Sequence, residues 1–70
     1  MYDYSKLRGR IVEKYGSMSA FADVLGTSKV TVSLKMNNEL GFTRENIIKW
    51  ADLLDIPEEE YALYFFCKTT

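Results

Sequence analysis

Histidine is absent from this 70-residue chain, and cysteine occurs once, as Cys67. Without histidine, neither a histidine-dependent catalytic triad nor a zinc site with histidine ligands is available. A single cysteine excludes an intrachain disulfide framework and a cysteine-based zinc site, and it is typical of a reducing cytoplasm. A glycine-rich phosphate-binding loop is also missing. We therefore expect a protein that is not an enzyme, has no cofactor or metal, and shows no evident small-molecule ligand.

Long hydrophobic runs are missing too. The longest, YALYFFC at residues 61–67, is far too short to cross a bilayer, and the opening MYDYSKLRGR has no apolar signal-peptide core. We expect no membrane partner and a cytoplasmic location. The length predicts one small domain over residues 1–70. A core of that size gives only a few kcal/mol of net stability, so self-association would help.

Positive charge is not in excess, since the formal net charge is −1. Its distribution is uneven: residues 1–44 sum to +3 and residues 45–70 to −4. Because salt screens charges more than about 8–10 Å away, a phosphate backbone responds to the face it meets rather than to the total. A basic docking face can therefore coexist with the acidic C-terminal part, which should weaken non-specific DNA binding.

Residues 17–38 predict two short helices joined by a tight glycine turn. The earlier helix of this pair has apolar residues at the i, i+3, i+4 and i+7 positions of one buried face: Met18, Phe21, Ala22 and Leu25. Gly26 suits the left-handed end of that helix, and Ser28 is a good N-cap for the next. The next helix would point Val32 and Met36 inward and leave its far side free. A helix with one free side has the right width for the DNA major groove.

The rest of the chain predicts three further helices around one core. A first helix is marked by Tyr4, Leu7, Ile11 and Tyr15, with Asp3 as its cap and Gly16 as its stop. After a loop over residues 37–42, in which Asn38 and Gly41 can take positive φ, Thr43 caps a fourth helix. The buried stripe of this helix is Ile47, Trp50, Ala51 and Leu54. Pro57 suits the first position of a fifth helix. A strand in TVSLKM, residues 31–36, is a minor possibility, and the expected fold is all-α with five helices.

These residues resemble the lambda-repressor-like, Cro/CI-type helix-turn-helix family of phage and bacterial DNA-binding regulators. The resemblance runs from Leu7 to Ile56 and rests on Phe21-Ala22, Leu25-Gly26, Ser28, Val32-Ser33, Met36-Asn37 and IIKWADLLDI. It implies a compact helix-turn-helix domain, with the helix-turn-helix at residues 17–37. Chains of this length resemble stand-alone, Cro-like phage or prophage repressors.

The resemblance also implies which residues contact DNA. Base contacts fall on the exposed early positions of the third helix, here Lys29, Val30, Thr31 and Leu34. Phosphate contacts fall on Ser28, Asn37 and Arg44. The apolar side chains of Val30 and Leu34 could contact thymine methyl groups, and Lys29 could reach guanine or a phosphate. The same apolar side chains could instead be ordinary surface residues or contact a partner protein.

Two further features bear on binding. Lys6, Arg10 and Lys14 recur at i, i+4 and i+8 and form a basic stripe, which could contact phosphates or be a solvated helix face.

Aromatic residues are in surplus over residues 57–67: Tyr61, Tyr64 and Phe65 could share the core face, leaving Phe66 beside Leu63. We predict that this C-terminal segment forms a homodimer contact, against the alternative of a fully intrachain core.

The sequence thus predicts a sequence-specific regulator of transcription, a repressor that binds a palindromic double-stranded DNA operator as a homodimer. The alternative is a protein-interaction module on the same scaffold, with weak or no DNA binding. The slight negative charge and the loop NELG at residues 38–41, which carries no basic residue, support the alternative.

Overall fold

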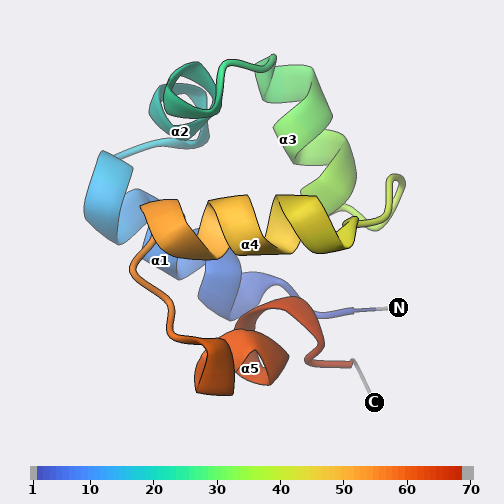
Figure 1. Cartoon of the computed structure of the whole chain (residues 1–70). Coiled ribbons are helices and arrows are strands. Elements are labelled where there is room, and N and C mark those ends of the chain that lie inside the picture. The colour runs from blue at the N-terminus through green and yellow to red at the C-terminus, as the bar shows by residue number, and fades with distance from the viewer. Residues whose placement is uncertain (1, 69–70) are drawn as a thin grey trace.

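The computed structural model describes residues 2–68, and in that range it contains five α-helices and one 3₁₀ turn (Figure 1). The helices are α1 (Ser5–Tyr15), α2 (Met18–Leu25), α3 (Lys29–Met36), α4 (Arg44–Leu53) and α5 (Tyr61–Phe65), which follows the turn η1 (Glu58–Glu60). In Figure 1, α4 crosses in front of α1, α2 and α3 lie above it, and α5 lies below. The all-α prediction is confirmed, and residues 31–36 belong to α3 rather than to a strand.

The core takes side chains from all five α-helices and from the segments beside them. Its buried members are Tyr4, Leu7, Ile11, Phe21, Ala22, Val32, Met36, Ile47, Trp50, Ala51, Leu54, Ile56 and Phe65. Phe21 and Trp50, both predicted as core, meet edge to face with ring centroids 5.0 Å apart. Phe42 also meets Trp50 edge to face, with ring centroids 4.8 Å apart, so the loop before α4 packs on the core as well. The apolar stripes predicted for the first four helices are therefore the faces that meet.

The start of α1 differs from the prediction by one residue. Tyr4, not Asp3, occupies the N-cap position, and its side chain makes no capping bond. Asp3 acts from one residue earlier, where Oδ1 accepts hydrogen bonds from the N–H of Ser5 at 2.9 Å and from its hydroxyl at 2.6 Å. These two bonds lower the pKa of Asp3. Tyr4 uses its ring in the core instead, and burial raises the pKa of its phenol.

Two loop predictions need correction. Asn38 does take positive φ, at +64°, but Gly41 does not, and the second such non-glycine residue is Asp55 at +54°. Pro57 does not begin an α-helix: it precedes the 3₁₀ turn, and α5 starts only at Tyr61. Because the N–H of Glu60 bonds to the Pro57 carbonyl at 2.9 Å, this first turn is tighter than an α-helical one.

Within residues 2–68, no helix is long and apolar enough to span a membrane.

Candidate nucleic-acid interface

The turn between α2 and α3 is fixed by local hydrogen bonds. At the start of α2, the Ser17 hydroxyl accepts a hydrogen bond from the N–H of Ala20 at 3.1 Å. Gly26 ends α2 in the left-handed conformation, at φ +76°, and its N–H bonds back to the last turn. Ser28 then caps α3 by accepting from the N–H of Thr31 at 3.1 Å. The capping roles predicted for Gly26 and Ser28 are confirmed, and together these bonds set the direction of α3.

Replacing Gly26 by alanine should lower the free energy of unfolding by about 1 kcal/mol, because the left-handed region is unfavourable for a residue with a Cβ. An added Cβ would meet no atom within 4 Å, so backbone conformation alone carries the effect. Gly41→Ala is the matched control, since Gly41 also has open space and lies outside that region. Urea unfolding measures both variants. If the two were equally stable, this account of the turn would be wrong.

The outer side of α3 is exposed at its start. Val32 and Met36 are buried, as predicted, while Lys29 faces solvent and Val30 is 67% exposed. Thr31 is half-buried, and its hydroxyl shares a hydrogen bond with that of Ser28 at 3.0 Å. The side chains free to reach a partner are therefore concentrated in the first turn of the helix.

Later positions of α3 are less open than predicted. Leu34 is half-buried rather than exposed, and its carbonyl accepts hydrogen bonds from the N–H groups of Glu39 and Leu40 at 2.8 and 3.2 Å. Asn37 is exposed and ends the helix. In Figure 1, α5 lies at the far end of the molecule from α2 and the start of α3, so the aromatic segment does not cover Val30.

The loop after α3 is fastened to the N-terminal segment. Asn38 Oδ1 accepts a hydrogen bond from the N–H of Tyr2, and Asn38 Nδ2 donates to the Tyr2 carbonyl, both at 2.9 Å. The N–H of Asp3 in turn donates to the carbonyl of Cys67 at 2.6 Å, beside a bridge between Tyr2 and Lys68. The far end of α3 is thus tied to both ends of the described chain.

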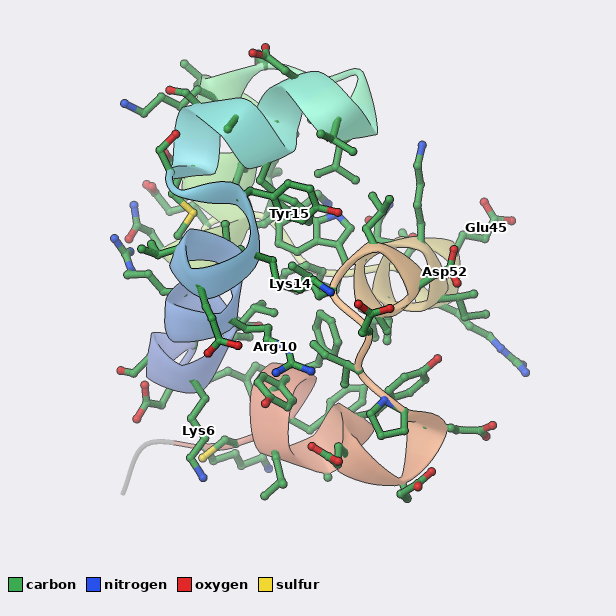
Figure 2. All side chains as sticks on the ribbon, turned by 90° about the vertical axis from the view of Figure 1, so that its left-hand side faces the viewer. Lys6, Arg10, Lys14, Tyr15, Glu45 and Asp52 are labelled. Atoms are coloured by element: carbon green, nitrogen blue, oxygen red, sulfur yellow. The ribbon has the colours of Figure 1, made fainter. Side chains whose placement is uncertain are left out.

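Arg10 and Lys14 were predicted to form a basic stripe with Lys6, but they bind the end of α4. Arg10 Nε donates to the Leu54 carbonyl at 2.8 Å, and a terminal nitrogen donates to that of Asp55 at 3.0 Å. Lys14 pairs with the Asp55 carboxylate. Figure 2 shows both side chains reaching from α1 toward α4 on the side that lies to the left in Figure 1, whereas α3 lies to the right.

Arg10 is therefore held by contacts within the chain rather than lying in a solvated stripe. The last carbonyl groups of a helix have no intrahelical hydrogen-bond partners, and the helix carries a partial negative charge at that end. The Arg10 guanidinium supplies both the hydrogen-bond donors and a compensating positive charge. Lys6 is exposed at the N-terminal end of α1 in Figure 2. Phosphate contact by Lys6 or Arg10 stays a prediction, and the contacts of Arg10 with the end of α4 do not favour it there.

Two more basic side chains form hydrogen bonds within the chain near α4. Lys35 Nζ donates to the Gly41 carbonyl at 3.1 Å and to Asn46 Oδ1 at 2.9 Å, and it lies 5.5 Å from the centre of the Phe42 ring. Lys49 Nζ donates to the carbonyl of Leu25 at 3.4 Å. The α3 side consequently offers less free positive charge than the residue count suggests.

The face between α4 and α5 was not identified from the sequence. Arg44, expected near DNA, is exposed and lines a groove there. Ile48 lies in the same groove and is 49% exposed. The signal was present, because Ile48 is a large apolar residue that lies outside the buried stripe predicted for the fourth helix.

The aromatic residues of the C-terminal segment divide as predicted. Phe65 is buried, Tyr61 and Tyr64 are half-buried against the core, and Leu63 and Phe66 are exposed. Part of Phe66 is used within the chain, since its ring lies edge-on to Tyr2 at 6.2 Å. Whether the remaining surface holds a second copy stays a prediction.

Comparison with known proteins defines the class: the fold is that of a phage regulator. The chain belongs to the family described as a protein of unknown function, DUF739, whose pattern matches residues 1–68. It is similar to the modulator of repression (MOR) of the temperate bacteriophage TP901-1 from Lactococcus lactis, whose structure was determined in solution. Sequence identity is 40%, the TM-score is 0.84, and the match covers 93% of this chain and 88% of the phage protein.

A comparison with curated proteins gives no significant match. The family and structural matches do not name the Cro/CI group, so the link to lambda-repressor-like proteins stays a resemblance.

Proposed function

We propose that this protein is a phage-type regulator that modulates repression and binds double-stranded DNA through α3. The observation that carries the proposal is the capped helix α3, which is anchored by Val32 and Met36 and presents Lys29 and Val30 to solvent. Its likeness to a phage modulator of repression supports the regulatory role. The proposed role needs no catalytic step and no cofactor, and it places the protein in the cytoplasm, where its DNA would be.

In this proposal, α3 enters the major groove by its N-terminal turn. Lys29 reaches guanine or a phosphate, and Val30 contacts a thymine methyl group. Thr31 and Leu34 are more buried in the protein than Lys29 and Val30. They discriminate between bases once the helix has approached the groove more closely. Phosphates are contacted by Ser28, Asn37 and Arg44, which position the helix without reading sequence.

The proposed operator is palindromic and is bound by a homodimer. Two-fold symmetry in the protein would place the two copies of α3 in major grooves about 10 bp apart, centre to centre. Leu63, which is exposed and does not line the groove between α4 and α5, is the apolar side chain that the C-terminal segment offers for the dimer contact.

A second candidate function is protein binding through the same side of α3. One observation favours it: Arg10, Lys14, Lys35 and Lys49 are all held by contacts within the chain. Such a surface attracts a phosphate backbone weakly, while Val30 is suited to an apolar partner. Retention on heparin or mixed DNA at low salt separates the candidates, since a protein-binding module would not be retained.

Arg44→Ala and Leu34→Ala should weaken DNA binding in different ways. Loss of a phosphate contact lowers affinity for all duplexes alike, so Arg44→Ala should flatten the slope of log affinity against log salt by about 1. Loss of a base contact should make Leu34→Ala lose sequence preference more than total affinity. Fluorescence anisotropy with a selected duplex and a random duplex measures both effects. The reverse pattern would refute this division of roles.

A further inference from the structure

A groove runs between α4 and α5, on a surface separate from the exposed start of α3. It consists of two adjoining hollows of about 610 and 420 Å³, which share Ile48 and Tyr61 as lining residues. Its apolar lining also includes Ile56, Phe42 and Phe66. Ile48 and Phe66 are each 49% exposed, so large apolar side chains face water on both walls of the groove.

The charges at this groove are mostly negative. Glu45, Asp52 and Glu58 line it, and Figure 2 shows Glu45 and Asp52 on the outward side of α4, away from α1. Two basic residues, Arg44 and Lys49, line it as well. Lys49 Nζ donates to the backbone carbonyl of Leu25, which turns it toward α2, and the five charged lining residues together carry a net charge of −1.

This charge pattern selects among possible occupants. The acidic residues disfavour nucleic acid and anionic lipid as occupants of the groove itself. A second copy of this chain would bring the same acidic excess to the contact, and like charges facing each other are costly. A positively charged partner gains attraction at the rim, and apolar side chains on one of its faces would cover Ile48 and Phe66. An amphipathic helix docked in an apolar groove combines these features.

We propose that the α4–α5 groove binds a basic amphipathic helix of a partner protein. Its apolar residues, spaced three and four apart, lie over Ile48, Tyr61 and Phe66. Its lysine or arginine residues lie beside Glu45, Asp52 and Glu58. This surface does not include Lys29 or Val30, although Arg44 lines it, so peptide binding at Ile48 can be tested independently of DNA binding by α3.

The test uses two synthetic helical peptides with the same leucine spacing, one with lysine and the other with glutamate at the remaining positions. Amide shifts in ¹⁵N–¹H spectra of the whole chain locate binding and give its affinity. We expect the lysine peptide to shift the amides of Ile48, Tyr61 and Phe66, and to bind at least tenfold more tightly than the glutamate peptide. Ile48→Asn should weaken binding of the lysine peptide about tenfold. Val24→Asn, at an equally exposed valine on α2, should not.

The acidic rim is tested by a second pair of variants. Glu45→Gln combined with Glu58→Gln should weaken the lysine peptide several-fold, while Asp23→Asn, at an exposed position on α2, should leave it unchanged. Equal binding of both peptides, shifts centred on α3, or equal loss in Val24→Asn would overturn the proposal. Concentration-dependent shifts at the groove without any peptide would also overturn it, since they would identify a second copy as the occupant.

Discussion

Arg10→Met is expected to lower the free energy of unfolding by about 2 kcal/mol, because it removes two hydrogen bonds from a charged donor to the end of α4. The Arg10 side chain is only 26% exposed, so water replaces these bonds incompletely. For a domain of this size the loss corresponds to a fall in melting temperature of roughly 10 °C. Methionine retains much of the apolar stem, so the change isolates the guanidinium.

Lys6→Met is the control for Arg10→Met, because Lys6 lies one turn earlier on the same helix and is exposed. It should change stability by less than about 0.5 kcal/mol. Thermal unfolding followed by circular dichroism compares the two. Should Arg10→Met keep wild-type stability and lose DNA affinity, the sequence-based phosphate role would be restored and the structural role rejected.

Val30→Glu is expected to weaken DNA binding about 100-fold while leaving the fold intact. The side chain is 67% exposed, so the substitution removes little core packing. A carboxylate at this point would face base edges and phosphates, and like-charge contacts at an interface cost several kcal/mol. Anisotropy with a selected duplex measures the loss, and unfolding in urea checks the stability.

The matched control is Val12→Glu, which places the same charge at a 48% exposed valine on α1. Both variants change the net charge equally, so general repulsion from DNA is the same in each. Equal weakening by the two would show that overall charge, rather than a docked α3, controls binding.

The helices could be predicted because burial follows a local period. Leu7 and Ile11 in α1, and Val32 and Met36 in α3, are buried residues four positions apart, and the capping residues Ser28 and Thr43 lie beside the helices they start. The break at Pro57 was missed because a proline at the first helical position and one before a 3₁₀ turn look alike in sequence.

The functional surface was predicted less completely, because side chains choose partners far away in the sequence. The residues that bind Arg10 lie 44 and 45 positions later, and no local pattern indicates that contact. The α4–α5 groove likewise depends on where α5 packs. The exposed start of α3 could be predicted, since Val30 and Val32 lie on opposite sides of any helix through them.

Selection of bound duplexes from a random DNA pool tests the central claim most directly, because it needs no prior operator sequence. At about 50 mM salt, the folded protein should enrich duplexes with two related half-sites about 10 bp apart, and Val30→Glu should enrich none. If the folded wild-type protein enriched no sequence under the same conditions, α3 would not be a DNA-reading helix, and the protein-binding candidate would stand in its place.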